Sequence, residues 1–364
     1  MTSSPVTTIP QPPTNRAHRY AHIDAMRAAA VLLVVIAHAG MGDIVPGGSG
    51  VTIFFSISGF IIAHLLLRER ERSGQFDLGG FYRRRLRKIG PPFLLIIVIP
   101  TLVYAGFKSI NWSDFASQIF FVFNWTTLDH EPQVLPGSGV VWSLAIEEQF
   151  YIGFSLVWLA MVRASRRPEL PLAVVAAGVV LYSTVARFVL SGESDRIYFS
   201  TDTRIDGMAL GILTAVLLRA ATRRQTSWPG TVLEWISRDA AFVLAVGLYL
   251  ASLLIRDPLF RDTMRYSLQS VASCIIILWG FGAQAGSLRR SVTPLLACRP
   301  VQIVGLASYS IYLVHLPLIH AIDAFWAPSR LVGLPVSIVV GVGAGIAIYY
   351  LIERPIADRQ KESK

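Results

Sequence analysis

The chain has 364 residues, of which 53% are hydrophobic and 15% are charged, and its formal net charge is +10. A soluble domain carries about 25% charged residues, so this composition, with its repeated long apolar runs, excludes an ordinary soluble protein. The basic residues gather in alternate loops, which is typical of membrane proteins and argues against a nucleic-acid-binding chain. We therefore expect an all-α, polytopic membrane protein with a single integral domain.

Ten apolar segments predict a bundle of about ten transmembrane helices. They cover roughly residues 24–41, 50–67, 91–107, 143–162, 171–190, 205–219, 240–255, 267–284, 302–322 and 331–352. Residues 1–23 are rich in Pro, Thr and Ser and predict a disordered tail. We expect a membrane-embedded domain at 24–355 and a second short tail at 356–364. The apolar segment 115–125 is too short to span and favours an interfacial or re-entrant piece.

The distribution of Lys and Arg predicts the orientation of the bundle. The loop at 68–90 holds eight basic residues, whereas residues 42–49 hold none. The loop at 256–265 is an exception to the alternation, partly offset by two aspartates. This bias places both tails in the cytoplasm and predicts a multi-pass protein of the cell membrane.

Two ionisable residues, Arg27 and His38, lie in the first apolar segment. Eleven positions are about three helical turns plus 20°, so both side chains are expected on one helix face, about 16 Å apart. Such residues at membrane depth usually face a bundle interior or a wet cavity. The ordinary pKa of histidine suits a general base, so His38 is the strongest catalytic candidate. A hydrogen bond between helices is the alternative for His38, and an interfacial anchor paired with Asp24 is the alternative for Arg27.

The second apolar segment begins with a small, polar stretch, GGSGVTIFFSISGF at 47–60. Within it, Ser58 and Gly59 present little side-chain bulk. One interpretation is the wall of a polar cavity that admits a slender chain, and the other is close helix packing by small residues.

A basic run, FYRRRLRK at 81–88, precedes the third apolar segment. Guanidinium groups match the geometry of phosphate, so this run predicts a phosphate site. The alternative is a stop-transfer cluster at the cytoplasmic surface. The four candidate phosphate ligands are Arg83, Arg84, Arg85 and Arg87.

Polar residues also mark the outer ends of three later segments. The sequence WSLAIEEQFY at 142–151 contains Glu147 and Glu148, which point about 100° apart on a helix, so at most one of them can face His38. That carboxylate would orient the imidazole, whereas a carboxylate in a first helical turn is also favoured by the helix dipole alone. The other candidates are Trp142, the pair Arg204 and Asp206, and Tyr312 with His315. A local ion pair and hydrogen bonds between helices are their structural alternatives.

Together these segments resemble the acyltransferase-3 family of integral membrane acyltransferases. The resemblance runs from Arg27 to Pro355. It is carried by the Arg-x10-His pair, the stretches at 47–60, 81–88 and 142–151, RIDG at 204–207, YSIYLVH at 309–315 and ERP at 353–355. Gly90 and a double proline after the basic run are a small departure, since the family pattern leads us to expect the proline sooner.

The resemblance implies an O-acyltransferase that moves an acyl group, often acetyl, from cytoplasmic acyl-CoA to a hydroxyl of a carbohydrate, a glycolipid or a glycosylated small molecule. It implies that Arg27 and His38 are needed. We expect the arginines at 83–87 to bind the phosphates of coenzyme A, with Arg27 and Ser58 along the path of its pantetheine arm. His38 would be the base, oriented by Glu147 or Glu148, and Arg204 or a nearby donor would stabilise the oxyanion. Trp142, Asp206, Tyr312 and His315 would contact the acceptor.

We expect no bound metal or permanent cofactor, because no zinc-ligand spacing or phosphate loop is present. The chain ends soon after its last apolar segment, so we also expect no fused extracytoplasmic domain. Two other classes of protein remain open: a transporter or flippase for an acylated sugar or small anion, with Arg27 and His38 along its path, and a non-catalytic membrane scaffold. The sequence leaves open the acyl chain length, the acceptor and the oligomeric state.

Overall fold

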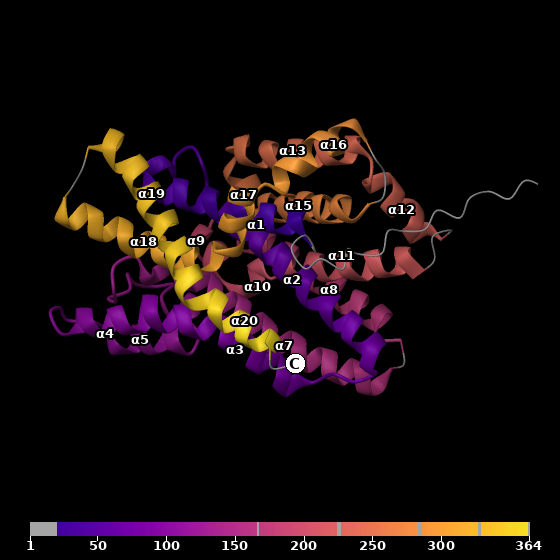
Figure 1. Cartoon of the computed structure of the whole chain (residues 1–364), viewed down its shortest axis with the longest axis horizontal. Helices are drawn as coiled ribbons and strands as arrows, with labels where there is room; N and C mark the ends of the chain where they lie inside the picture. Colours follow the sequence, from indigo (N-terminus) through magenta and orange to yellow (C-terminus); the bar gives the residue numbers. More distant parts are fainter. Residues whose placement is uncertain (1–19, 166, 224–226, 283–285, 327–328, 363–364) are drawn as a thin grey trace, which may run out of the picture.

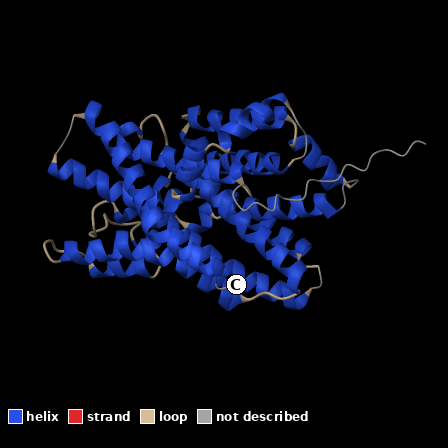
Figure 2. Ribbon diagram, in the orientation of Figure 1, coloured by secondary structure: helices blue, strands red, loops and turns tan. Residues whose placement is uncertain are grey.

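The computed structural model describes residues 20–362, apart from 166, 224–226, 283–285 and 327–328. The described residues form helices joined by loops, as Figures 1 and 2 show. The helices of the first half are α1 (Ala21–Ile36), α2 (Gly47–Ser73), α3 (Leu78–Phe93), α4 (Ile99–Ala105), α5 (Trp112–Ile119), α6 (Phe123–Thr126), α7 (Val141–Ala164) and α8 (Glu169–Val189).

The second half of the chain continues the same architecture. Its helices are α9 (Ser194–Phe199), α10 (Thr201–Arg204), α11 (Asp206–Arg223), α12 (Trp228–Ile236), α13 (Asp239–Leu254), α14 (Pro258–Thr263), α15 (Arg265–Phe281), α16 (Ser287–Leu296), α17 (Arg299–Leu306), α18 (Ser308–Phe325), α19 (Arg330–Ile348) and α20 (Arg354–Glu362). Three wider π-helical turns continue α1, α3 and α19: they are η2 (Ala37–Met41), η3 (Leu94–Val98) and η5 (Tyr349–Glu353). A short 3₁₀ turn, η4 (Ser138–Val140), precedes α7.

By length and composition, the described residues contain six helices that could cross a membrane, or up to eight if each of two bent pairs is one span. The bent pairs are α12 with α13 and α17 with α18, each with a 72° break. The remaining two of the ten expected segments form α11 and α15. The 17 residues of α15 cover about 26 Å, less than a hydrocarbon core of about 30 Å, and α11 contains one aspartate and two arginines. The structure therefore supports six to eight candidate spans.

The ends of the apolar region differ in detail from our expectation. Helix α1 begins at Ala21, so residues 21–23 belong to a helix rather than to the tail, whereas residues 1–19 lie outside the described residues. At the other end, α20 continues as far as Glu362. The segment 115–125 forms α5 and α6, neither of which is long enough to span. The side chain of Asn111 caps α5 by accepting a hydrogen bond from the Ser113 N–H at 2.8 Å.

Helix α2 lies at the centre of the bundle, where it packs on α1, α11 and α15. Its contact with α11 is a backbone contact, because a Cβ atom at Gly59 would overlap the carbonyl oxygen of Met208, and one at Gly211 would overlap that of Ser56. Close packing by small residues, one of our two interpretations of this stretch, thus applies to Gly59. Ser58, the neighbouring residue, points to a different face of α2.

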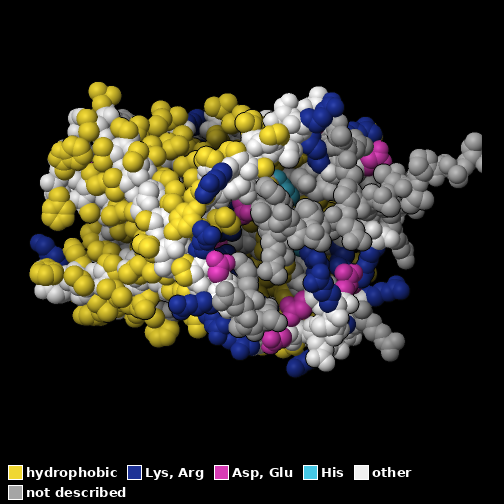
Figure 3. Space-filling model, in the orientation of Figure 1, with side chains coloured by type: hydrophobic (Ala, Val, Ile, Leu, Met, Phe, Trp, Pro, Cys, Tyr) yellow, Lys and Arg dark blue, Asp and Glu magenta, His cyan; other side chains and the backbone are white. Residues whose placement is uncertain are grey.

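Hydrophobic and basic side chains gather in different parts of the molecule. Hydrophobic side chains cover the end that holds α4, α5 and α19, and most Lys and Arg side chains lie toward the middle and the other end (Figure 3). This segregation is expected of a protein whose apolar end is surrounded by lipid and whose basic residues face water.

Candidate active site

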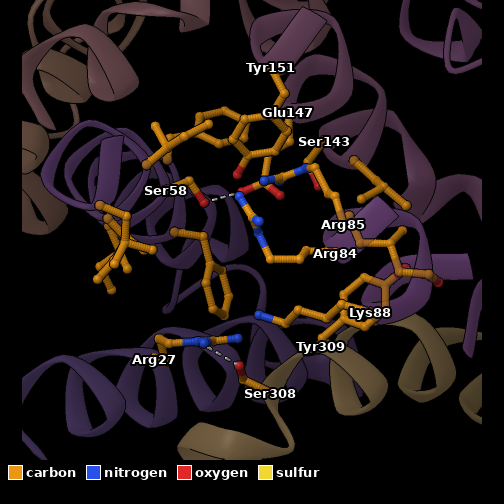
Figure 4. Close-up of a pocket in the computed structure, with 18 of the residues that line it drawn as sticks. Arg27, Ser58, Arg84, Arg85, Lys88, Ser143, Glu147, Tyr151, Ser308 and Tyr309 are labelled. Atoms are coloured by element: carbon orange, nitrogen blue, oxygen red, sulfur yellow. Dashed lines mark hydrogen bonds between the residues drawn. The ribbon is translucent and has the colours of Figure 1, made fainter. Parts of the chain in front are cut away.

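The cavity that the structure forms beside α2 has a volume of about 360 Å³. Side chains of α1, α2, α3, α7 and α18 line it, and Figure 4 shows them converging on one space. Its charged lining residues are Arg27, Glu69, Arg84, Arg85, Lys88 and Glu147. We call this space the inner cavity, since it is built largely from the basic run that our topology places on the cytoplasmic side.

Four cations therefore face two carboxylates in the inner cavity. Arg27 donates from Nε to the Ser308 hydroxyl at 3.1 Å. Within the described part of the chain, neither Arg27 nor Lys88 has a carboxylate oxygen within 4.0 Å. Arg84 lies 3.6 Å from Glu69 across the opening. The excess of positive charge makes the inner cavity a site for an anion.

Helix α3 presents only part of its basic run to the inner cavity. Arg84 and Arg85 line it, whereas Arg83 and Arg87 are exposed on the other side of α3 and do not. Lys88 lines the cavity although we did not include it among the coenzyme A ligands. Lys88 follows Arg84 by four residues and Arg85 by three, so its side chain lies on the same face of α3 as both arginines. This spacing could be seen in the sequence.

Glu147 lines the inner cavity, and Glu148 pairs with Arg85, another of its lining residues. The Ser58 hydroxyl donates to Glu147 Oε1 at 2.5 Å, and Arg85 Nε donates to Glu148 Oε1 at 3.2 Å. The guanidinium of Arg85 also lies over the ring of Tyr151. In the described structure His315, rather than either carboxylate, lies against the His38 ring, and the role of a carboxylate in orienting His38 stays a prediction.

His38 lies in the wide turn η2, which continues α1 and ends near Gly40 at φ 113°. Wide helical turns of this kind occur often at functional sites, because they shift a side chain from its regular position. His38 Nδ1 lies 3.0 Å from the carbonyl oxygen of Val34 and 3.2 Å from Nε2 of His315. His315 is fully buried, and His38 keeps an exposed edge.

These contacts select one tautomer of each imidazole. His315 Nδ1 lies 2.7 Å from the carbonyl oxygen of Tyr312, and a carbonyl only accepts, so this nitrogen carries the hydrogen. Nε2 of a neutral His315 then accepts from His38 Nδ1–H, which also donates to Val34 O. The unprotonated nitrogen of His38 is consequently Nε2, on the far side of the ring, as a general base requires.

Replacing His315 with alanine is expected to lower the rate of acetyl transfer about tenfold to a hundredfold, because His38 loses the acceptor that fixes its tautomer. His315→Gln, whose amide oxygen can accept the same hydrogen bond, is expected to restore part of the rate. The measurement is kcat together with its pH profile, in which His315→Ala shifts the acidic limb, where the base becomes protonated, and His315→Gln does not. Equal loss in both variants with unchanged pH profiles would show that the buried imidazole only packs.

Arg27 lines the inner cavity and His38 does not, although we expected the two side chains on one helix face. The lining of this cavity includes Ser143 and Tyr312. The Tyr312 hydroxyl lies 2.7 Å from the Ser143 hydroxyl, and its ring centroid lies 5.8 Å from that of His315. Tyr312 therefore stands between the inner cavity and the histidine pair, so this tyrosine is part of the site.

The other predicted acceptor residues lie deeper than expected. Asp206 is 1% exposed and forms an ion pair at 2.8 Å with the fully buried Arg187, which joins α8 to α11; its contact with the acceptor stays a prediction. Trp142 packs against Tyr198 and lines neither the inner cavity nor the cavity beside the loop at 42–49. Arg204 is 1% exposed and lies 3.7 Å from the centre of the Tyr266 ring.

Burial changes the acidity of the groups around Arg204. It lowers the pKa of the Arg204 guanidinium, although Tyr266 and Tyr198 partly offset this effect. It raises the pKa of Tyr198 to about 12, so this hydroxyl stays protonated at neutral pH.

Within the described residues, no three His, Cys, Asp or Glu side chains gather in a way that could hold a metal ion.

The fold defines a helical protein with several candidate membrane spans and a polar cavity inside its bundle. Residues 20–354 match the acyltransferase domain family, and the chain belongs to this family. Its curated relatives include O-acetyltransferase OatA of Staphylococcus aureus strain NCTC 8325 / PS 47, which is 28% identical over 331 residues. A putative O-acetyltransferase of strain COL is 27% identical over 323 residues.

Both alignments cover 85% of this chain and 52% of the relative. The chain thus spans about half the length of the curated relatives it matches. No solved structure matches the chain.

Proposed function

We propose that the protein is a cell-membrane O-acetyltransferase that moves an acetyl group from cytoplasmic acetyl-CoA to a hydroxyl of a carbohydrate, glycolipid or glycosylated small molecule. The observation that carries this proposal is the inner cavity, in which Arg27, Arg84, Arg85 and Lys88 outnumber two carboxylates. Coenzyme A carries several phosphate groups and a thioester at the end of a slender arm, which this charge and shape suit.

The donor would enter from the basic side of the bundle. Arg84, Arg85 and Lys88 lie on α3 and would hold the phosphates, while Ser58 and Arg27 lie deeper along the same cavity. The pantetheine arm would then point toward Ser143 and Tyr312, which close the cavity on the side of the histidine pair. This arrangement rests on the predicted topology, with about ten membrane segments and both tails in the cytoplasm.

His38 would act as the general base for the transfer. Nε2 of His38 takes the proton from the acceptor hydroxyl while its oxygen forms a bond to the thioester carbonyl carbon. The carbon–sulfur bond then breaks, and the sulfur of coenzyme A receives the proton from the imidazolium. The products are the acetyl ester and free coenzyme A, and no oxidant or metal is needed for the balance.

Release of free coenzyme A from purified protein in detergent tests this function. We expect acetyl-CoA and a suitable glycoside to give free thiol and an acetylated product, seen as a gain of one acetyl mass, without any membrane gradient. A transporter or flippase would instead require a closed membrane, so movement of substrate into vesicles without thiol release would overturn the proposal. Loss of acetyl mass from surface glycans of a deletion strain would identify the acceptor in the cell.

Replacing Lys88 with glutamine is expected to raise KM for acetyl-CoA about tenfold, which corresponds to about 1.4 kcal/mol, with a smaller effect on kcat. The physical reason is the loss of a charge-assisted contact to phosphate at a cation that has no carboxylate partner in the described structure. Arg72→Gln, an exposed cation of α2 outside the cavity, is the matched control. An equal KM change in both variants would contradict phosphate binding at Lys88.

A further inference from the structure

A second cavity, of about 310 Å³, lies beside the loop that follows α1 and shares no lining residue with the inner cavity. It is formed by this loop and by residues of α9, α14 and α15. The lining residues that matter here are Gly47, Asp195, Tyr198, Arg261, Arg265 and Tyr266. We call it the outer cavity, since the loop at 42–49 is expected on the outer side of the membrane.

The outer cavity borders on His38. Gly47 lines it, and a Cβ atom placed on Gly47 would lie 3.7 Å from Cε1 of the His38 ring. Glycine at this position places no side chain of its own between the imidazole and the cavity. A molecule in the outer cavity can therefore place a hydroxyl near the edge of the ring that carries Nε2.

A buried cation without an acidic partner lines the outer cavity. Arg265 is 9% exposed, and its guanidinium donates to the Tyr266 hydroxyl at 2.8 Å. No carboxylate oxygen of the described chain lies within 4.0 Å of it or of Arg261, the exposed arginine at the cavity rim. Burying an unpaired guanidinium is costly, so such a group is expected to receive an anion.

The neighbouring carboxylates are held by other groups. Asp262 accepts from the Ser194 hydroxyl at 3.0 Å and from the Gly192 N–H at 3.3 Å. Asp202 pairs with Arg196 at 2.7 Å, and Asp206 pairs with Arg187 at 2.8 Å. Asp195, an exposed lining residue, forms no ion pair within the described residues. Asp202 and Asp206 thus pair with other arginines, whereas Asp195 and Asp262 line the outer cavity without forming an ion pair with Arg265 in the described structure.

A second buried guanidinium adds to the positive potential. Arg204 lies 3.7 Å from the centre of the Tyr266 ring, and Arg265 lies 4.8 Å from the same ring. Nη1 of Arg204 is buried and has no hydrogen-bond partner within the described structure. Two like charges lie around one aromatic ring, and within the described residues neither has a carboxylate oxygen within 4.0 Å, which favours binding of a negative group in the adjoining cavity.

We infer that the outer cavity binds an anionic group of the acetyl acceptor, a carboxylate or a phosphate, through Arg265 and Arg261, and so holds the acceptor beside His38. The carboxylate would belong to an acidic sugar, and the phosphate would be one that joins a sugar to a lipid carrier. Tyr198 and Tyr266 offer ring faces and hydroxyls for the sugar itself. The inference rests on the proposed function in one respect, that the bound molecule is the acetyl acceptor. Binding of an anion in the outer cavity does not depend on it.

Direct binding to the purified full-length chain in detergent, without acetyl-CoA, tests the inference. The probes are methyl glucuronide, glucose 1-phosphate and neutral methyl glucoside, each titrated by calorimetry. We expect at least one anionic probe to bind at least tenfold more tightly than methyl glucoside. The probe that binds more tightly indicates whether the acceptor carries a sugar carboxylate or a sugar phosphate. Equal affinities for all three probes, or no binding of either anion, would overturn the inference.

Variants locate the binding site. Arg265→Gln is expected to weaken binding of the preferred anion at least tenfold, and Arg261→Gln, at the exposed rim where folding is not at risk, about threefold. Arg256→Gln, an exposed cation of the same loop region, is the control. Anion binding that survives both cavity variants would overturn the assignment. Anion binding in a protein that transfers no acetyl group to any acceptor would instead overturn the proposed function alone.

Discussion

Replacing His38 with alanine is expected to lower kcat for acetyl transfer about 10²-fold to 10⁴-fold, the usual contribution of a general base. The reason is geometric, since His315 and Val34 both accept from Nδ1 of His38 and leave Nε2 unprotonated. The measurement is the rate of thiol release with saturating acetyl-CoA and acceptor. Affinity for acetyl-CoA is expected to change little, because His38 does not line the inner cavity.

His130→Ala is the control for this experiment, since His130 is an exposed histidine of the loop after α6 and contacts Asp114 rather than His38. We expect it to leave the transfer rate within about twofold of that of the unaltered protein, as surface substitutions usually have small effects. Undiminished transfer by a well-expressed His38→Ala protein would contradict the assignment of the base.

Replacing Gly59 with leucine is expected to destabilise the bundle by about 3 kcal/mol or more, because any Cβ atom there meets the backbone of α11. The helices α2 and α11 would have to separate, and α2 also carries Ser58 at the inner cavity. The measurement is the thermal unfolding midpoint in detergent, together with the yield of folded protein.

Gly153→Leu provides the matched control, since a Cβ atom on this glycine of α7 meets nothing within 4 Å. We expect its unfolding midpoint to stay within a few degrees of that of the unaltered protein. Similar loss in both variants would mean that the cost comes from leucine in any helix rather than from contact between α2 and α11.

Much of the architecture could be predicted because apolar periodicity and length are local properties. The sequence predicted a helical membrane protein, and it also predicted that residues 115–125 are too short to span. The number of candidate spans was less predictable. Whether a charged 18-residue helix such as α11, or a 17-residue one such as α15, crosses the bilayer depends on what surrounds it.

The candidate site was predictable in part. The basic run pointed to Arg84 and Arg85, which the structure places in the inner cavity, but not to their separation from Arg83 and Arg87. Lys88 could have been added from its helical spacing. The pairing of Glu147 with Ser58 could not have been predicted, because the two residues are 89 positions apart and meet only when α2 packs near α7.

By itself the sequence determined the class of protein, the helices and the chemical kinds of side chain available, since these follow from composition, period and motif. Only the tertiary structure decided which groups meet. It placed His315 rather than a carboxylate against His38, paired Asp206 with Arg187 and left Arg265 without an acid. The physical reason is that hydrogen bonds and ion pairs act over a few ångströms, so their partners are set by how helices distant in sequence pack together.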